Sequence, residues 1–235
     1  MELTTLLKRL SRVVGMIIVG EDVADIGADH AQLSLFIVEN QLVRRVVIGE
    51  LGDGPFHRAQ EAVAASERAD LIEVRQGDGL QVLNEGEVST VVIAGMGGDT
   101  ICDIMRHDRR KAESMKRFVF QPMSKYGSLR SLLLHWGWII LEEDVVYENE
   151  HFYLLLSAQP SNAVYSLTDL EMEIGVGILC ADTETKRRFL KYYLKKYRKM
   201  YKGLRESKSA EKQQEADALH QQIKELEGIL HADQG

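Results

Sequence analysis

The amino-acid sequence predicts an α/β protein with a doubly wound parallel sheet that ends in an antiparallel hairpin and is followed by a helical domain. Short runs rich in Val and Ile alternate with helical patterns through the first 136 residues, which is typical of a parallel sheet covered on both faces. Two longer extended runs then follow each other, and no strand pattern occurs after Leu167. With 235 residues, 45% of them hydrophobic, the chain can bury one large core and a smaller second unit.

The first predicted element is an amphipathic helix. Apolar residues recur there at helical spacing, namely Leu3, Leu6, Leu7, Leu10 and Val13. The charges of Lys8, Arg9 and Arg12 interrupt the apolar run, so the segment is neither a signal peptide nor a membrane span. The two cysteines, Cys102 and Cys180, lack CxxC spacing and favour a reducing compartment. We therefore expect a cytoplasmic protein with no membrane partner.

Five strands and four helices are expected to alternate after this helix. The strands are predicted at residues 22–26, 45–50, 71–75, 90–95 and 117–121. Their near-continuous apolar character indicates burial on both faces. Crossover helices are predicted at residues 31–40, 56–67, 99–114 and 127–136. This alternation is the pattern of a parallel sheet.

The end of the sheet is predicted to be antiparallel. Residues 138–147 and 151–158 form two extended runs joined by the short polar link ENE, which fits a hairpin. Beyond it, two heptad stripes predict an antiparallel helical hairpin of coiled-coil type, with Leu190, Leu194, Tyr197, Tyr201 and Leu204 on one helix and Ala216, Leu219, Ile223, Leu226 and Leu230 on the other. We place the two domains at residues 1–163 and 164–235.

The formal net charge of −7 conceals a basic block in the helical domain. Residues 186–208 contain 11 basic side chains and a single acid, a local balance of +10. Such density predicts either a docking surface for phosphate groups or a solvated helix face. The cations that lie mostly off the apolar stripe include Lys191, Lys195, Arg198, Lys199 and Lys202. A second basic stretch runs from Arg106 to Arg117 and includes Arg109 and Arg110.

The first strand ends in the sequence ADIGADHA, which predicts a ligand site over the strand end. Gly27 lets a ligand approach the backbone, and the following helix offers free N–H groups. A dinucleotide site would need further glycines, but this chain has Asp29 and Ala31 at those positions. The Asp29 carboxylate would repel a pyrophosphate. A cationic or zwitterionic ligand is therefore favoured, and an NAD-dependent dehydrogenase is disfavoured.

Acids and glycines also follow the next three strands. Glu50 ends the second strand 25 residues after Asp25, where a carboxylate can accept two hydrogen bonds from a ribose diol. Asp78 lies between two glycines and can accept a hydrogen bond from an adenine amino group. The fourth strand ends in AGMGGDT, whose glycines open the floor of the cleft. Because ligands bind at the carboxyl ends of such strands, these residues, with the terminal hairpin, point to S-adenosylmethionine.

Several segments of the chain resemble a bacterial family, the tRNA (adenine-22-N1)-methyltransferases. They are DIGADHAQL, GELGDGPFHRAQ, GDGLQVL, VVIAGMGGDTI, Gln121–Pro122 and Leu129–Arg130. The resemblance covers essentially the whole chain. It implies a class I, Rossmann-like methyltransferase domain with a seven-stranded sheet and a C-terminal coiled-coil domain. It also implies methyl transfer from S-adenosylmethionine to N1 of an adenine in the D-arm region of tRNA, at position 22.

The resemblance and the strand-end pattern together give candidate site residues. The cofactor-binding candidates are Asp25, Gly27, Asp29, His30, Glu50, Asp78, Gly79, Ala94, Gly95 and Met96. The substrate-binding candidates are Gly97, Gly98, Gln121, Arg109, Arg110, Lys191, Lys195, Arg198, Lys199 and Lys202. Asp29 is the first catalytic candidate and His30 the second; each could instead be a turn residue or a cofactor contact, and for His30 this alternative is slightly favoured. Gln121 could contact the target base or satisfy backbone at the strand end. The family pattern has asparagine where this chain has Met123.

Two other functions remain open from the sequence. One is a small-molecule methyltransferase whose basic hairpin mediates dimerisation, and salt-sensitive tRNA binding would separate it from the main interpretation. The other is a non-catalytic RNA-binding protein on a methyltransferase fold, against which the intact Gly27, Glu50 and Asp78 argue. The seven histidines show no metal-ligand spacing, so no metal is expected. A monomer is favoured, because the short heptad stripes can pair within one chain.

Overall fold

The computed structural model describes residues 6–232, so Leu3 of the expected first helix lies outside the described residues. Contacts within the chain divide it into two compact units, Met1–Ser166 and Leu167–Gly235. The first helix, α1, runs from Lys8 to Val14, and Leu6 and Leu7 precede it rather than forming its first turn. No helix among the described residues is both long and apolar enough to cross a membrane.

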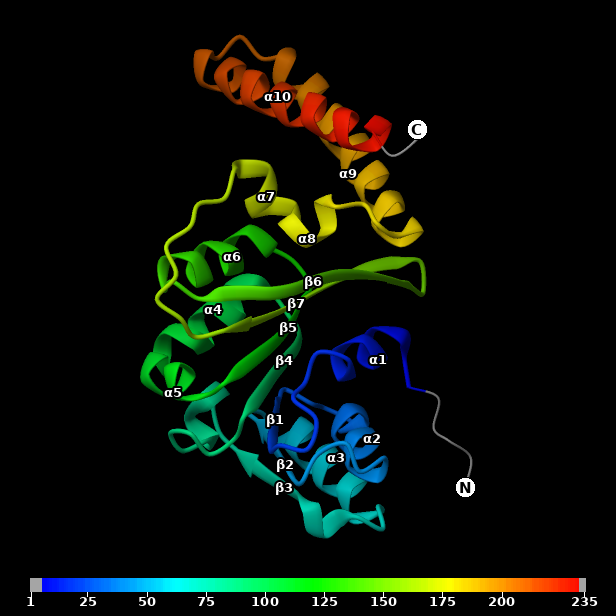
Figure 1. Cartoon of the computed structure of the whole chain (residues 1–235), viewed down its shortest axis with the longest axis vertical. Helices are drawn as coiled ribbons and strands as arrows, with labels where there is room; N and C mark the ends of the chain where they lie inside the picture. Colours follow the sequence, from blue (N-terminus) through cyan, green and yellow to red (C-terminus); the bar gives the residue numbers. More distant parts are fainter. Residues whose placement is uncertain (1–5, 233–235) are drawn as a thin grey trace. The chain divides into compact units, whose positions relative to one another are not determined.

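The first unit is built on a seven-stranded sheet in the order β3-β2-β1-β4-β5-β7-β6 (Figure 1). Its strands are β1 Val23–Ile26, β2 Val46–Glu50, β3 Ile72–Gln76, β4 Thr90–Met96, β5 Arg117–Pro122, β6 Ile139–Glu148 and β7 His151–Gln159. The first five strands pair in parallel, whereas β7 is antiparallel to both β5 and β6. The predicted α/β fold with a terminal antiparallel hairpin is confirmed.

After α1, the helices of this unit are α2 Gln32–Glu39, α3 Asp53–Ala64, α4 Gly98–His107, α5 Arg109–Ser114 and α6 Tyr126–His135, with 3-10 turns η1 Ala69–Leu71 and η2 Gly79–Val82. These helices differ from expectation in two places. The single helix expected at 99–114 is wrong, because the backbone at Asp108 leaves the helical region with φ −120° and ψ 43°. Helix α3 begins at Asp53, earlier than expected, and an acid in the first turn is favoured by the helix dipole.

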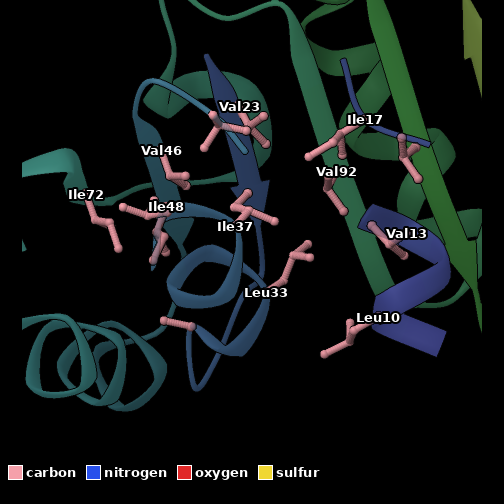
Figure 2. Packing of buried hydrophobic residues seen from close by; sticks show 14 of the residues in the cluster. Leu10, Val13, Ile17, Val23, Leu33, Ile37, Val46, Ile48, Ile72 and Val92 are labelled. Atoms are coloured by element: carbon pink, nitrogen blue, oxygen red, sulfur yellow. The ribbon is translucent and has the colours of Figure 1, made fainter. Parts of the chain in front are cut away.

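A core of aliphatic side chains fixes the strands against the helices (Figure 2). Val23, Val46 and Ile48 of the strands are fully buried, as is Ile37 of α2. Leu10 of α1 belongs to the same cluster. All residues of β1 and β2 are buried, which explains why these strands are continuously apolar rather than alternating. The carboxyl ends of the strands are therefore held at one rigid edge.

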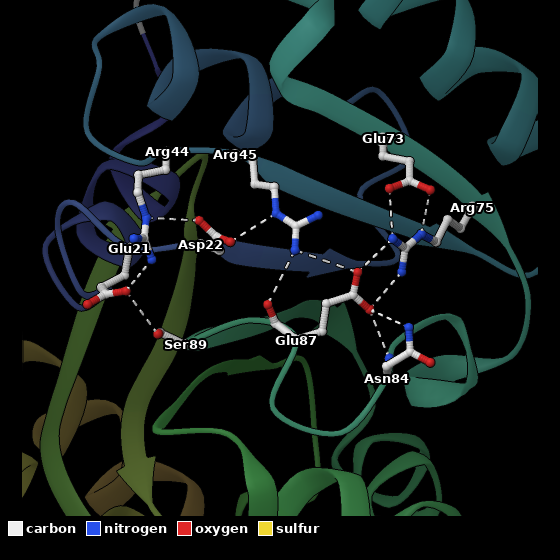
Figure 3. Close-up of polar contacts among 9 residues, drawn as sticks. All are labelled: Glu21, Asp22, Arg44, Arg45, Glu73, Arg75, Asn84, Glu87 and Ser89. Carbon is white, nitrogen blue, oxygen red and sulfur yellow. Dashed lines mark hydrogen bonds and ion pairs between the residues drawn. The ribbon is translucent and has the colours of Figure 1, made fainter.

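Charged residues that precede β1, β2 and β4 form an ion-pair network with β3 (Figure 3). Arg45 pairs with Asp22 across 2.9 Å. Arg75 of β3 pairs with both Glu73 and Glu87, each at 2.7 Å. Hydrogen bonding to Arg75 lowers the pKa of Glu87 to about 2. The network joins the loops at the amino ends of these strands, opposite the edge where the strands end.

The regular elements in the described part of the second unit are all helices. Its helices are α7 Asp169–Ile174, α8 Val176–Leu179, α9 Glu184–Arg205 and α10 Ala210–Ala232. Helices α9 and α10 lie side by side and bury residues of the two predicted stripes, including Leu190, Leu194, Leu219 and Ile223. The antiparallel pairing follows from the short turn between them. That these helices form a regular coiled coil stays a prediction.

Candidate active site

A cavity of about 390 Å³ lies at the carboxyl ends of β1 and β4. Its wall is formed by the loop after β1, the start of α2, the end of β4 and part of α1. Seven of the predicted cofactor-binding residues line it, namely Asp25, Gly27, Asp29, His30, Ala94, Gly95 and Met96. The structure thus brings the first and fourth strand-end motifs together at one site.

The loop between β1 and α2 has an unusual backbone. Gly27, Asp29 and Ala31 all adopt positive φ angles, of 75°, 51° and 54°, and only glycine takes this conformation without cost. The N–H of Asp29 donates a hydrogen bond to Oε1 of Glu50 across 2.5 Å. The end of β2 therefore holds the loop in its strained shape through the same carboxylate that is predicted to bind a ribose.

Two buried carboxylates lie at the ends of β1 and β2: Asp25 lines the cavity, whereas Glu50 lies outside its lining. Burial raises the pKa of Asp25 to about 6, against the lowering effect of the hydrogen bond that the Ser34 hydroxyl donates to it. Burial also raises the pKa of Glu50, and the charge of Glu50 raises that of Asp25 further. Each charge would be stabilised by a cation in the cavity. The electrostatics therefore favour a positively charged ligand.

The carboxylate of Asp29 is partly neutralised from a neighbouring helix. Arg58 of α3 donates two hydrogen bonds to Oδ1 of Asp29, at 2.8 and 2.6 Å. The other oxygen, Oδ2, lies 3.5 Å from Nε2 of His30. Both Asp29 and His30 have side chains about half exposed or more, at 49% and 64%. Arg58 was not predicted, because it stands 29 residues away on a helix with no motif pointing to Asp29.

The end of β4 shapes the cavity through glycines. Gly95 has a φ of 78° and open space where a side chain would begin, so the backbone itself forms that part of the wall. A side chain on Gly27 would collide with the end of Met96. Gly27 is therefore required for Met96 to lie against the loop, where it lines the cavity.

Gly98 has a structural role that the sequence did not indicate. It is buried at the start of α4, and its N–H donates to the carbonyl of Ser124 across 2.9 Å. The N–H of Met123 donates to the carbonyl of Met96 at 2.8 Å. These bonds fasten the loop after β5 to the end of β4. Gly97 is less crowded, because a Cβ at that position would have Oγ of Ser124 as its nearest neighbour, at 3.4 Å.

Helix α1 contributes a residue that sequence reasoning missed. Arg9 lines the cavity, its guanidinium lies 3.4 Å from Oε1 of Gln121, and it sits 5.6 Å from the centre of the Tyr153 ring. Gln121 is buried, and its amide donates to the carbonyl of Pro122 at 3.3 Å and to the sulfur of Met123 at 3.2 Å. The sequence showed Arg9 only as a charge on an amphipathic helix.

The predicted adenine-binding residues lie beyond the lining of this cavity. Asp78 and Gly79 stand at the start of the turn η2, directly after β3. The N–H of Gly77 donates to the carbonyl of Glu50 across 2.9 Å, which joins this turn to the end of β2. Gly79 has a φ of 51°, and a side chain there would come within 2.7 Å of Ile104. Gly79 thus allows close packing of the turn on α4.

The predicted basic residues differ in how they are paired. Lys191, Lys195, Lys199 and Lys202 lie exposed on α9, and none of them makes an ion pair within the described residues. Arg198 pairs with Glu227 at 2.6 Å. In the other unit, Arg109 pairs with Glu113 at 2.7 Å and lies 5.0 Å from the centre of the Trp136 ring, and Arg110 pairs with Glu85 at 3.0 Å. The strongest unneutralised positive charge is therefore on α9.

Comparisons with known proteins give the chain its family. Residues 23–228 match the family model described as tRNA (adenine(22)-N(1))-methyltransferase. A Bacillus subtilis protein of that name is 33% identical over 72% of this chain and 71% of its own length. The crystal structure of the B. subtilis m1A22 tRNA methyltransferase is 27% identical, with a TM-score of 0.85 over 96% of this chain and 99% of that one.

A second solved structure includes a ligand. It is a Streptococcus pneumoniae protein in complex with S-adenosyl-L-methionine, 27% identical, with a TM-score of 0.83 over 97% of this chain and 100% of that one. The family match covers most of the chain, and the chain belongs to the tRNA (adenine(22)-N(1))-methyltransferase family.

Proposed function

We propose that this member of the tRNA (adenine(22)-N(1))-methyltransferase family transfers a methyl group from S-adenosylmethionine to N1 of adenine 22 in tRNA. The observation that carries the proposal is the cavity at the ends of β1 and β4, which the carboxylates of Asp25 and Asp29 line beside a glycine loop. S-adenosylmethionine is a sulfonium cation that supplies an electrophilic methyl group, so its charge matches this cavity.

The residues that would hold the donor come from four strand ends and α1. Glu50 would accept hydrogen bonds from the ribose hydroxyls, and Asp78 would accept one from the adenine amino group. The amino-acid end of the donor is zwitterionic, so its carboxylate needs a cation. Arg9 and His30 are the basic side chains that line the cavity. We assign the carboxylate to Arg9, because its guanidinium can bind it through two hydrogen bonds.

The target adenine would enter beside Gly95 and Met96. N1 of neutral adenine has an in-plane lone pair, so it can attack the methyl group without first losing a proton. Most of the acceleration must then come from positioning. Gln121 lies at the end of β5 with its amide already engaged by neighbouring groups, so base contact requires its rearrangement or a contact through Oε1.

Asp29 and His30 are the proposed groups that act on developing charge. Methylation at N1 makes the base cationic, and a nearby carboxylate stabilises that charge. Arg58 donates two hydrogen bonds to Oδ1 of Asp29, so this oxygen is already engaged and the carboxylate is held in place. We therefore assign Asp29 an electrostatic role and propose His30 as the group that accepts a proton from the exocyclic amine.

The basic face of α9 would dock the tRNA. The target edge of adenine is hidden by pairing or stacking, and exposing it costs a few kcal/mol. Contacts between phosphates and Lys191, Lys195, Lys199 and Lys202 would offset that cost without reading sequence. In the sheet unit, Arg109 and Arg110 are weaker candidates for phosphate contacts, because Glu113 and Glu85 already neutralise them.

Docking on α9 predicts a change in salt dependence. The double variant Lys195→Glu with Lys199→Glu should make the negative slope of log affinity against log salt concentration shallower, by about 1 for each phosphate that is no longer neutralised. The same charge reversal at Arg109 and Arg110 should change the slope less. Filter binding of tRNA across a salt series measures both slopes. An unchanged slope for the α9 variant would remove this helix from the interface.

Two further proposals concern the oligomeric state of the enzyme and the compartment in which it acts. The apolar stripes of α9 and α10 pack on each other within one chain, so we propose a monomer, which light scattering can measure. We also propose that the protein acts in the cytoplasm, where unmodified tRNA is available.

Glu50→Gln tests the donor site directly. Gln keeps an oxygen that can accept the Asp29 N–H, but it loses the charge that strengthens bonds to the ribose. Charge-assisted hydrogen bonds contribute about 1.5–3 kcal/mol, so calorimetry should show binding of S-adenosylmethionine weakened by about 10- to 100-fold. The matched control is Glu73→Gln on β3, which makes the same charge change away from the cavity. Equal affinity in the two variants would exclude Glu50 from the donor site.

Incorporation of labelled methyl groups into a tRNA transcript tests the reaction itself. Wild-type protein should label the transcript, and Glu50→Gln should require more donor to do so. Donor binding without any labelling of tRNA would favour a small-molecule acceptor.

A further inference from the structure

Helix α1, with the residue before it, forms one wall of the donor cavity. Leu7, Arg9 and Leu10 line the cavity on this side, and the other lining residues come from β1, α2, β4 and the loop between β1 and α2. A helix of seven residues is not stable alone in water. The contacts that α1 makes with the sheet therefore decide where its lining side chains lie.

Apolar contacts hold α1 on the sheet but do not orient it. Leu10 and Val13 are buried in the core of the sheet unit, and α1 lies against the hairpin of β6 and β7 (Figure 1). The hydrophobic effect is non-directional, so this burial tolerates small rotations and shifts of the helix. A directional contact is needed to fix the guanidinium of Arg9 at one place in the cavity.

Arg12 makes a directional contact of this kind with β6. Its Nε donates a hydrogen bond to Oδ2 of Asp144 across 2.5 Å, and its Nη2 donates to Oε1 of Glu142. The guanidinium is planar, so bonds to two separate carboxylates fix its orientation as well as its distance from the strand. The backbone N–H of Lys8 also donates to Oε1 of Glu148, at 2.7 Å. Strand β6 thus holds both ends of α1.

The helix connects Arg12 to the cavity, although Arg12 is not one of the lining residues. Arg9 stands three residues earlier, and side chains at this spacing are neighbours on one helix face. The Arg9 guanidinium lies 3.4 Å from Oε1 of Gln121 on β5 and 5.6 Å from the centre of the Tyr153 ring on β7. A rotation of α1 that broke the ion pairs of Arg12 would therefore also move Arg9.

We propose that Arg12 is a positioning residue for the methyl donor. Its ion pairs with Glu142 and Asp144 hold α1 in the one orientation that places Arg9 and Leu10 against the bound donor. Arg12 itself touches neither the donor nor the target base. The inference rests on the proposed function, in which this cavity binds S-adenosylmethionine and Arg9 binds its carboxylate.

Calorimetric titration of the full chain with S-adenosylmethionine tests this role in Arg12→Gln. Binding should weaken by about three- to tenfold, because only the fraction of molecules with α1 correctly placed can bind well, and the two lost ion pairs are partly exposed. Arg12→Lys keeps the charge and should recover part of the affinity. In methyl-transfer assays, the KM for the donor should rise by the same factor while kcat stays within about twofold, since saturating donor restores the position of α1.

A second variant removes the same contacts from the strand. Glu142→Gln with Asp144→Asn leaves α1 unchanged in sequence and should weaken donor binding as much as Arg12→Gln does. Combining all three substitutions should weaken it no further, because the same ion pairs are lost in each case. Circular dichroism checks that the variants are folded. Additive weakening in the combined variant would overturn the inference, because Arg12 would then act independently of these acids.

The matched control is Arg44→Gln at the opposite edge of the sheet. Arg44 also bonds to two carboxylates through Nε and Nη2, those of Asp22 and Glu21, and it should leave donor affinity within about twofold. Equal weakening in Arg44→Gln and Arg12→Gln would mean a general loss of stability and would overturn the inference. Wild-type affinity in Arg12→Gln would overturn this inference alone, whereas absence of donor binding by the wild-type protein would contradict the proposed function and this inference with it.

Discussion

Replacing Gly98 by alanine should destabilise the sheet unit and displace the loop that follows β5. A Cβ at this position would lie 2.7 Å from the carbonyl oxygen of Ser124 and closer still to that of Lys125. Ordinary contacts between carbon and oxygen begin at about 3.3 Å. Both oxygens belong to the backbone, so no side-chain rotation can relieve the collision and the loop itself must move.

The expected loss of stability has two parts. Overpacking of this kind costs roughly 1–3 kcal/mol, and the bond from the Gly98 N–H to the Ser124 carbonyl contributes about 1 kcal/mol. If the loop moves enough to break that bond, the total is about 2–4 kcal/mol, or a factor of about 30 to 1000 in the ratio of folded to unfolded protein. Gly97→Ala is the matched control, because its Cβ would approach only the Ser124 hydroxyl, at 3.4 Å.

Tryptophan fluorescence makes the measurement specific. The chain has two tryptophans, Trp136 and Trp138, and both are buried in the sheet unit. Urea unfolding followed by this signal therefore reports on that unit. Gly98→Ala should lower the midpoint clearly, whereas Gly97→Ala should change the free energy of unfolding by less than about 1 kcal/mol. Equal midpoints for the two variants would refute the steric argument.

Three further predictions concern buried charge and the catalytic loop. Burial raises the pKa of Asp25 to about 6, so between about pH 4 and 6 the folded state holds a proton on Asp25 that the unfolded state has lost; in the absence of S-adenosylmethionine, the free energy of unfolding should therefore fall over this range by roughly 3 kcal/mol. Asp25→Asn should remove this fall, measured as urea midpoints against pH, and an unchanged pH profile would contradict the prediction. Arg130→Met should cost about 3–5 kcal/mol, because it leaves the buried Glu143 carboxylate without the guanidinium 2.7 Å away. Adding Glu143→Met should restore part of the loss in thermal unfolding; no recovery would argue against the charge as the cause. Asp29→Asn should retain donor binding by calorimetry while losing turnover, whereas equal loss of both would remove Asp29 from the catalytic groups.

The fold could be predicted because its signals are local. The strands of this sheet are buried on both faces, so Val and Ile runs such as residues 46–48 identify them directly. Heptad spacing likewise indicated which side chains of α9 and α10 become buried. The break at Asp108 was not predicted from the sequence. No residue type within 99–114 indicated the end of a helix, and only the backbone angles at Asp108 mark the break.

The site could be predicted only where the chain itself carries a motif. Asp25 and Glu50 lie at the carboxyl ends of neighbouring strands and Gly27 follows one of them directly, so their meeting at one edge follows from the topology. Arg9 and Arg58 reach the site from helices, and their direction depends on how those helices pack. A helical charge pattern shows that such residues face away from the core, but it does not show which loop they meet.

The position of the methyl group on tRNA tests the central claim most directly. After incubation of an unmodified tRNA transcript with S-adenosylmethionine, reverse transcription should stop at a single site, adenine 22, because a methyl group on N1 blocks the pairing edge. A transcript with guanine at position 22 should show neither the stop nor label incorporation. A stop at another adenine, or equal labelling of the guanine-22 transcript, would contradict the assignment of this chain's substrate.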